Sequence, residues 1–440
     1  MTAPQASASK RSPLLLVFLT VFIDLLGFGI VIPLLPIYSK AYQASNTELG
    51  LLFASFSGMQ FLFAPMWGRL SDRIGRRPVL IGGLLGSALA YALFAYIDVV
   101  GAWVAPHLPG ETWSAERATL AVLFASRLLA GFFGANVSTA FAYIADVTTP
   151  ENRAKGMGLV GAAFGLGFTI GPALGGELSQ VSLHAPGLAA SGLSLCSALF
   201  GFLTLPEPPR ASRSGSRVFS LDQLRGAIAD PRIGLALTLS FLVIVAFSAF
   251  ESMFIPLGLK LYPEYFGQSA AIAEPTRDQI LAAGRYAGRY LFVVGLISAA
   301  IQGGFIRRLV PRFGETKLAI AGQLILGLGL LIVGLASHFW VVVLGCVVMP
   351  FGLGINNPSV NSMISRSAPA HEQGAYLGLQ QSTASLARMA GPLMAGVLSD
   401  LSGARSPFIV AALVLVVSAG LALRYHARYG AAFVKKPVEA

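Results

Sequence analysis

Long apolar segments, separated by short polar ones, follow one another along almost the whole chain. A helix needs about 20 apolar residues to cross a bilayer. Twelve segments meet that length, near 14–38, 47–67, 79–100, 119–143, 156–178, 187–205, 233–257, 286–306, 316–337, 339–363, 374–398 and 406–424. None of them alternates with the period of two that marks a membrane strand. The pattern therefore predicts an all-α integral membrane protein with twelve transmembrane helices.

The composition agrees with a membrane protein. Only 12% of the 440 residues are charged and 55% are hydrophobic, whereas a soluble protein carries about a quarter charged residues. Both cysteines, Cys196 and Cys346, lie in apolar segments, which indicates neither a disulfide framework nor a metal site. No small-residue cleavage site follows the polar start of the chain, so we interpret the first apolar segment as a span and not as a removed signal peptide.

The positions of lysine and arginine predict how the chain lies in the membrane. If the N-terminus is inside, most of the 31 Lys and Arg residues fall in inner segments. The outer segments carry Lys40, Arg117, Lys260, Arg277, Arg285, Arg289 and Arg405. Because cytoplasmic loops are enriched in these residues, both termini are predicted to be cytoplasmic. The net charge of +11 is then a topology signal and requires no nucleic acid partner.

A weak internal repeat divides the chain. The stretch GMGLVGAAFGLGFTIGPALGG (156–176) aligns with YLGLQQSTASLARMAGPLMAG (376–396), so that Pro172 falls on Pro392. The repeat predicts two pseudo-symmetric six-helix bundles of common origin.

The predicted boundaries follow from this repeat. The bundles are expected at 1–205 and 233–440, joined by a cytoplasmic linker at 206–232 that is rich in Pro, Arg and Ser. Within the linker, FSLDQLRGAIAD (219–230) places apolar residues on one helical face, which predicts a helix on the inner membrane surface.

A dense group of charges interrupts the apolar pattern in GRLSDRIGRRPVL (68–80), where we expect a tight cytoplasmic turn. Its arginines would hold the turn inside, but Asp72 contributes nothing to that rule. Asp72 could be a solvated carboxylate paired with Arg73 or Arg76. Alternatively, it could lie at the N-terminus of the segment that begins near Gly374, where a carboxylate gains roughly 0.3–1 kcal/mol. In that position it would act as a latch between the two halves.

Four ionisable residues fall inside the predicted spans, namely Asp24, Arg127, Glu251 and Arg388. A charge in hydrocarbon costs a few kcal/mol or more unless it is paired, so each is a functional candidate. At 1.5 Å per residue, Asp24 and Arg127 lie at about 15 and 18 Å from the inner face, and the other two share the outer half. We therefore predict two pairs. They could be permanent ion pairs that fix packing, or proton-coupling sites.

Asp24 has the stronger case for proton coupling. Its apolar neighbours favour the neutral acid, and Arg127 would favour the carboxylate. A carboxyl group under opposed influences can bind and release a proton as its surroundings change. A further acid, Glu177, lies at the outer end of the fifth predicted span.

A binding cavity is expected near the midplane, between the halves. Amides in hydrocarbon need a partner or a cavity, whereas most aromatic residues simply pack or face lipid. The candidate substrate-binding residues are Phe28, Gln60, Asn136, Tyr143, Phe164, Phe247, Phe250, Asn357, Asn361, Gln380 and Gln381.

Several motifs carry a family resemblance. GRLSDRIGRRPVL resembles the loop signature of the major facilitator superfamily between its second and third helices. RLLAG (127–131) is similar to its fourth-helix motif, whose arginine is linked to proton coupling, and GFTIGPALGG (167–176) resembles the fifth-helix motif of antiporters. FIDLLGFGIVIPLLP (22–36) and AYIADVTTPENRAKGMG (142–158) look like the tetracycline/proton antiporters and their drug-efflux relatives.

The resemblance implies the major facilitator fold and two functional sets of residues. The gate residues that it implies are Gly68, Asp72, Arg73, Gly75, Arg76, Asp146 and Arg153. The antiporter kink that it implies, which would seal the bundle against ion leak, comprises Gly167, Gly171, Pro172, Gly175 and Gly176. Close packing alone would also account for the kink. In the second half, RRLVPRFGE (307–315) places Pro311 where Asp72 would stand, which argues against a second latch.

We predict a secondary transporter that exports small amphipathic or drug-like compounds in exchange for protons by alternating access, with tetracycline-like compounds among the candidates. The alternative is a proton symporter or facilitator that takes up a small nutrient. No nucleophile–base cluster, metal-ligand spacing or phosphate loop indicates an enzyme or a cofactor. The expected partners are the small-molecule substrate, protons and the lipid bilayer. The protein is expected to function as a monomer in a cell membrane, most simply the bacterial inner membrane.

Overall fold

The computed structural model contains helices, and no strands, in the part of the chain that it describes. The described residues are 13–108, 113–148, 150–208, 225–226, 229–267, 277–301, 304, 306–369 and 373–430. The first half contains α1 (Pro13–Val31), α2 (Leu34–Ala41), α3 (Asn46–Ile74), α4 (Arg76–Ala95), α5 (Ile97–Val104), α6 (Ala115–Gly134), α7 (Val137–Val147), α8 (Pro150–Leu178) and α9 (Ala185–Thr204). The second half contains α11 (Pro231–Leu261), α12 (Arg277–Ala300), α13 (Ile306–Phe313), α14 (Glu315–Leu335), α15 (Phe339–Ser367), α16 (Gln373–Ser402) and α17 (Ser406–Tyr429).

The predicted spans fall on these helices. Nine helical stretches in the described ranges are long and apolar enough to cross a membrane. In hydrocarbon only a helix satisfies the backbone groups of an isolated segment, which is why apolar length and helix coincide. The other three predicted spans fall on α8, α12 and α16, and the count of twelve stays a prediction. The predicted linker helix lies largely outside the described residues.

Two of the predicted spans are each made of two helices. The span predicted at 14–38 is interrupted between α1 and α2, at Pro33, which has no N–H to continue the ladder. The span predicted at 119–143 is interrupted between α6 and α7, where Asn136 Nδ2 donates to the Leu80 carbonyl at 3.4 Å.

The charged stretch 68–80 is more helical than the expected turn. Helix α3 continues through Ile74, and only Gly75 separates it from α4. Gly75 has φ +110°, a conformation that other residues rarely adopt. Gly314, with φ +76°, separates α13 from α14 in the same way, which supports the alignment of the two stretches.

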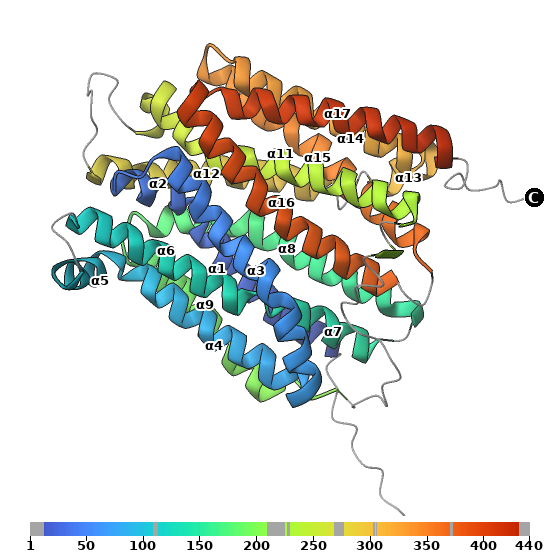
Figure 1. Cartoon of the computed structure of the whole chain (residues 1–440), viewed down its shortest axis with the longest axis horizontal. Helices are drawn as coiled ribbons and strands as arrows, with labels where there is room; N and C mark the ends of the chain where they lie inside the picture. The colour runs from blue at the N-terminus through green and yellow to red at the C-terminus, as the bar shows by residue number, and fades with distance from the viewer. Residues whose placement is uncertain are drawn as a thin grey trace, which may run out of the picture.

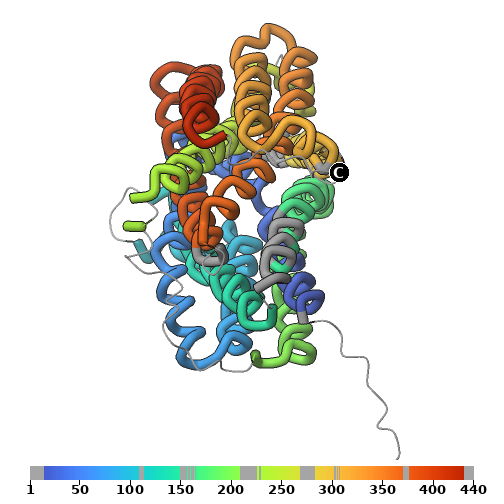
Figure 2. Tube along the Cα trace, turned by 90° about the vertical axis from the view of Figure 1, so that its right-hand side faces the viewer, coloured from blue at the N-terminus to red at the C-terminus, as the bar shows by residue number. Residues whose placement is uncertain are grey.

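The helices run between two ends of the molecule (Figure 1). Helices α2 and α5 lie at the left end of that view, and α13 and the last turn of α17 lie at the right. The right end is the one whose loops are predicted to be cytoplasmic, so we call it the inner end and the opposite one the outer end. Figure 2 views the inner end, with the first half below and the second half above.

The apolar core is shared by both halves toward the outer end and divided toward the inner end. The largest cluster of buried residues joins Leu34 and Leu49 of the first half to Phe250 and Phe408 of the second. Two further clusters have their buried residues in one half each, one around Tyr425 and the other around Leu16, Tyr143 and Leu205, although the partly buried Leu377 of α16 packs against the latter. Across the halves, α3 packs against α16 and α8 against α12. The halves therefore meet at the outer end.

Candidate functional site

Two adjoining cavities lie where helices of both halves meet. The first is lined by Phe28, Ile32, Leu35, Phe53, Phe56, Ser57, Arg127, Phe168, Ser248, Glu251, Arg388 and Pro392. The second is lined by Asp24, Leu25, Phe28, Phe56, Gln60, Ser87, Tyr91, Ala130, Gly134, Val137, Phe168 and Arg388. Four residues line both cavities: Phe28, Phe56, Phe168 and Arg388. All four ionisable residues predicted inside the membrane therefore reach this region.

Asp24 is buried, with 9% of its surface exposed. Its Oδ1 accepts a hydrogen bond of 3.3 Å from Ser194 Oγ of α9. An ionised carboxylate can accept about four such bonds, so Asp24 has acceptor capacity left on the side of the second cavity. That arrangement suits a group that takes up a proton from the cavity.

Arg127 is almost fully buried, and its guanidinium lies over the rings of Phe94 and Tyr91, at 5.0 and 5.8 Å from their centroids. Such cation–π contacts offset part of the cost of burying the charge. Its Nε and Nη2 have no hydrogen-bond partner in the structure. The ion pairs between described residues do not include Asp24 with Arg127. Instead, both charges border Tyr91, which also lines the second cavity.

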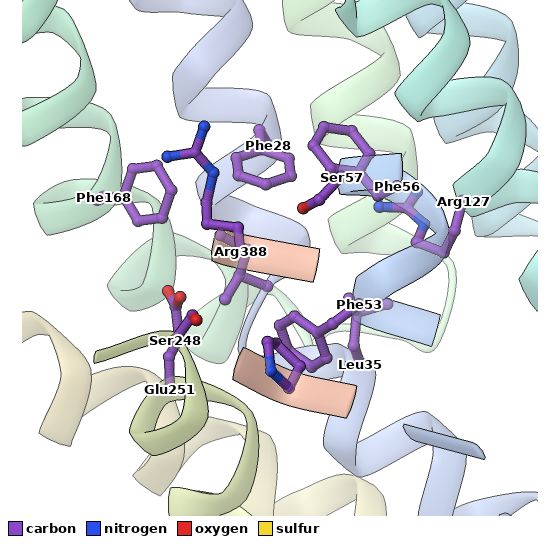
Figure 3. A pocket seen from close by; sticks show the side chains of 12 residues that line it. Phe28, Leu35, Phe53, Phe56, Ser57, Arg127, Phe168, Ser248, Glu251 and Arg388 are labelled. Carbon is purple, nitrogen blue, oxygen red and sulfur yellow. The ribbon is translucent and has the colours of Figure 1, made fainter. Parts of the chain in front are cut away.

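Glu251 and Arg388 line the same cavity without forming an ion pair in the described structure. Arg388 Nη2 donates to Ser385 Oγ at 3.3 Å. Figure 3 shows the Arg388 guanidinium directed toward Phe28 and Phe168, with the Glu251 carboxylate on another side of it. Because Arg388 also lines the cavity that contains Asp24, this cation lies within the reach of an acid from each half.

We expect Glu251→Gln and Arg388→Gln to lower thermal stability by less in combination than the sum of the two single losses. Each change leaves the other charge without its counter-charge in a poorly hydrated place. A coupling of about 0.5–3 kcal/mol is typical of neighbouring residues. The measurement is thermal unfolding of the purified variants in detergent. As a control, Arg388→Gln combined with Asp98→Asn, remote on α5, should be additive. Additive losses in the first pair would show that the two residues act independently.

The predicted gate residues form a charged cluster at the inner end of the first half. Arg76 is 4% exposed, and it binds Asp72 at 2.8 Å and Asp146 of α7 at 2.9 Å. Its Nη1 also donates to Ser71 Oγ at 2.5 Å. The pairing of Asp72 with Arg76 is one of its two predicted roles. The other, a contact with the helix start at Gly374, falls on side chains outside the described set and stays a prediction.

The remaining gate candidates are placed as follows. A Cβ atom at Gly68 would meet nothing within 4 Å, and a Cβ at Gly75 would lie 2.7 Å from Glu207 Oε1. The side chain of Arg73 is exposed, and that of Arg153 lies outside the described residues.

The second half has a corresponding buried cluster that the sequence reading missed. Glu315, directly after Gly314, accepts from Arg366 of α15 at 2.6 Å and from Ser362 at 3.2 Å. Its position matches that of Arg76 after Gly75, with the signs of the charges exchanged. In the sequence, the available signal was Gly314, which aligns with Gly75.

The glycines of the predicted kink bring α8 close to two helices. A Cβ at Gly171 would lie 2.5 Å from the Gly29 carbonyl carbon of α1, and Gly167 and Gly175 also face α1. A Cβ at Gly176 would lie 2.8 Å from the Gly284 carbonyl oxygen of α12. Pro172 lies inside the continuous helix. Close packing is therefore present, and sealing against ion leak stays a prediction.

Some of the predicted substrate-binding residues line the cavities, and others pack elsewhere. Phe28 and Gln60 line the cavities, and Gln60 Nε2 also donates to the Gly134 carbonyl at 3.3 Å. Tyr143 donates to the Pro206 carbonyl at 2.7 Å, and Asn136 to that of Leu80, as part of the first-half packing. Sequence analysis missed the aromatic lining residues Phe53, Phe56, Tyr91 and Phe168. The side chain of the predicted Phe164, one turn before Phe168, lies outside the described residues.

In the second half, the candidates line neither of the two cavities. Phe250 is buried in the shared core and Phe247 packs beside it. Gln380 Nε2 donates to Asn361 at 2.5 Å and to Ser240 at 3.3 Å, and Asn357 accepts from Asn356 at 3.5 Å. The backbone carbonyl of Gln381 accepts from Ser385 at 3.2 Å.

Sequence comparison finds similarity over nearly the whole chain. A family profile described as Major Facilitator Superfamily matches residues 17–306 and 269–438. The Escherichia coli tetracycline resistance protein, class C, is 31% identical over 391 residues, which cover 88% of this chain and 89% of that protein. The human major facilitator superfamily domain-containing protein 10 is 30% identical over 444 residues, covering 91% and 90%.

Solved structures agree with this similarity. The crystal structure of the human organic anion transporter MFSD10 (TETRAN) matches with a TM-score of 0.67 at 27% identity, and the match covers 94% of this chain and 100% of that one. The nucleoside transporter NupG matches with a TM-score of 0.65 and covers 94% and 99%, but at 15% identity it bears on the fold alone.

Proposed function

The chain belongs to the Major Facilitator Superfamily, and we propose that it exports small amphipathic or drug-like compounds in exchange for protons by alternating access. One observation carries this proposal. An acid from each half, Asp24 and Glu251, lines adjoining cavities at the boundary between the halves, where aromatic rings also gather. The proton site and the substrate site would then share one space.

The exchange follows from that shared space. Asp24 and Glu251 are in no ion pair with another described residue, so each can take up a proton when the cavity is empty of substrate. A substrate that binds among the same side chains changes their hydration and their neighbouring charges, which favours release of the proton. Asp24 and Glu251 are the proposed proton carriers, and Arg127 and Arg388 adjust their charge balance.

The wall of the cavities supports an amphipathic substrate. Phe28, Phe53, Phe56 and Phe168 supply apolar faces, and Gln60 supplies an amide. Ligand sites that combine apolar walls with a few polar groups bind compounds of mixed character. Since relatives that align with most of the chain are tetracycline resistance proteins, tetracyclines are the first compounds to test. We propose that the protein lies in the bacterial inner membrane with both termini in the cytoplasm.

A second function is favoured by the two arginines of the first cavity. An anion bound to Arg127 and Arg388 would free the acids to take up protons, so that anion and proton would bind together. The protein would then be a proton symporter. The related human protein MFSD10, whose structure is titled an organic anion transporter, fits this alternative.

The direction of proton movement distinguishes exchange from symport. Purified protein in liposomes receives tetracycline outside, with no initial pH difference, and a dye reports the external pH. Exchange should acidify the outside as the compound enters, whereas symport should make it alkaline. Liposomes without protein provide the background. No proton movement with a panel of neutral, cationic and anionic amphipathic compounds would contradict the proposed proton coupling.

A further inference from the structure

We propose that two outer acids, Asp400 and Glu177, are positioning residues of the transport cycle that hold the outer end closed. The inference rests on alternating access, as in the proposed function, but it concerns residues that touch neither cavity. Each acid lies at the end of a proline-containing helix of one half and binds a helix of the other half. We call the two contacts the Asp400 latch and the Glu177 latch.

The Asp400 latch joins the end of α16 to the start of α3. Asp400 accepts hydrogen bonds from the backbone N–H groups of Asn46 and Thr47, at 3.2 and 2.7 Å. It also accepts from Asn46 Nδ2 at 2.9 Å and from Thr47 Oγ1 at 2.7 Å. One carboxylate of the second half therefore makes four bonds to the first half.

These bonds complete a helix N-terminus. The first N–H groups of a helix have no partner within it. In α3, Ser45 Oγ accepts from Glu48 N, and Asp400 of the other half accepts from Asn46 and Thr47. The positive end of the helix dipole also favours the carboxylate. When the outer end opens, this capping must be given up, so it stabilises the closed arrangement selectively.

The Glu177 latch joins the end of α8 to two arginines in the first part of α12. Glu177 binds Arg285 at 3.2 Å and Arg289 at 2.8 Å. Arginine can use two nitrogens to hold a carboxylate, but these side chains are about half exposed. Exposed ion pairs stabilise weakly. Asp400 is exposed as well, but its four bonds include two to backbone N–H groups at a helix start, so we expect the Glu177 latch to contribute less.

Below the two latches, the packing is the same in both interfaces. The carbonyl oxygen of Pro172 in α8 faces Gly288 of α12, so closely that a Cβ there would collide with it. The carbonyl oxygen of Pro392 in α16 faces Gly50 of α3 in the same way. Since Pro172 and Pro392 are equivalent in the repeat, the molecule has two related seams, and each ends in an acid at the outer end.

The helix pair α3 and α16 thus carries an acid at each end. Asp400 lies in the outer end of α16 and contacts the start of α3, whereas Asp72 lies near the inner end of α3. The predicted contact of Asp72 with the start of α16 would be the reciprocal latch. Only the outer one is seen between the residues described, in agreement with the shared outer core.

Sided cysteine labelling tests the Asp400 latch. In a background with Cys196→Ala and Cys346→Ala, Ser57→Cys provides a small reporter in the wall of the first cavity. A membrane-impermeant maleimide is added to the two faces in separate vesicle preparations. Asp400→Ala should raise labelling from the outer face and lower it from the inner face. Loss of a helix cap corresponds to a roughly two- to thirtyfold change in the open-to-closed ratio.

Matched variants separate gating from general stability. Glu48→Gln removes a charge at the same outer end, where Glu48 pairs with Arg117 inside the first half, and should leave both labelling rates unchanged. Asp400→Asn, which keeps one acceptor oxygen, should be intermediate, and Glu177→Gln should act in the same direction but less.

Two results would overturn the proposal. One is unchanged labelling in Asp400→Ala, and the other is labelling that rises or falls equally from both faces, which would make Asp400 an ordinary stabilising cap. The assay needs neither substrate nor proton gradient. If Asp400→Ala shifts labelling but the protein moves no protons, the latch proposal is therefore supported and only the proposed function is contradicted.

Discussion

Replacing Asp24 with asparagine should reduce substrate-driven proton movement to the level of protein-free liposomes, while the protein remains folded. Asp24 is buried and lines the second cavity, and it belongs to no ion pair in the described structure. Asparagine keeps the acceptor for Ser194 Oγ and nearly the same volume, but it cannot carry the proton. The measurement is external pH in the liposome assay described above, with thermal unfolding as the test of folding.

The matched control is Asp98→Asn. Asp98 is an acid of the first half that lines neither cavity and bonds to the Val99 N–H at the start of α5. This variant should move protons as the unaltered protein does. Undiminished proton flux in Asp24→Asn would sink the proposal that Asp24 carries the proton, and would direct attention to Glu251.

A valine at position 288 should stop transport, because α8 and α12 could no longer meet at the outer end. A Cβ on Gly288 would collide with the Pro172 carbonyl oxygen and lie 2.9 Å from Gly176 Cα. Both obstacles are backbone, which cannot rotate aside as a side chain can. Overpacking typically costs about 1–3 kcal/mol, which is a roughly five- to hundredfold loss of the outer-closed form. Transport rate and inner-face labelling of Ser57→Cys should fall together.

Gly192 offers the control for this experiment. It lies in the membrane helix α9, and a Cβ there would meet nothing within 4 Å. Gly192→Val adds the same volume and the same β-branched stiffness to a helix without touching the seam, so transport should continue. Gly288→Ala should lie between the two. Normal transport by Gly288→Val would show that the α8–α12 seam is not tight during the cycle.

Much of the fold was predictable because apolar length leaves the backbone few choices in hydrocarbon. The interruption at Pro33 also follows from a residue that cannot donate a hydrogen bond. The interruption between α6 and α7 has no such marker. It depends on the side chain of Asn136 reaching the Leu80 carbonyl of another helix, and that contact exists only after the helices are packed.

The site was predictable in its charges but not in their geometry. Asp24, Arg127, Glu251 and Arg388 stand out because each interrupts an apolar segment. Depth along a helix supplied the predicted pairs, but it fixes one coordinate and leaves the rotation of each helix open. In the structure Arg127 faces the rings of Tyr91 and Phe94, and Arg388 lies between cavities that contain acids of both halves.

The outer contacts were hidden for a different reason. Asp400 and Glu177 lie near span ends, where acids are ordinarily solvated. Nothing in the neighbouring sequence therefore marks them as functional candidates. Their partners are backbone N–H groups and surface arginines more than 100 residues away along the chain. The internal repeat was the usable signal, because it relates Pro172 to Pro392 and therefore one seam to the other.

The Asp400 latch also has a consequence for how the protein is made. Membrane helices are inserted as the ribosome delivers them, from the N-terminus onward. Helix α3 emerges early, yet the carboxylate that completes its first turn is residue 400 of 440. Until that residue arrives, the first turn of α3 has only the cap that Ser45 and Glu48 provide, and Gly50 lacks its partner in α16. The first half therefore cannot complete this contact until nearly the whole chain has been synthesised.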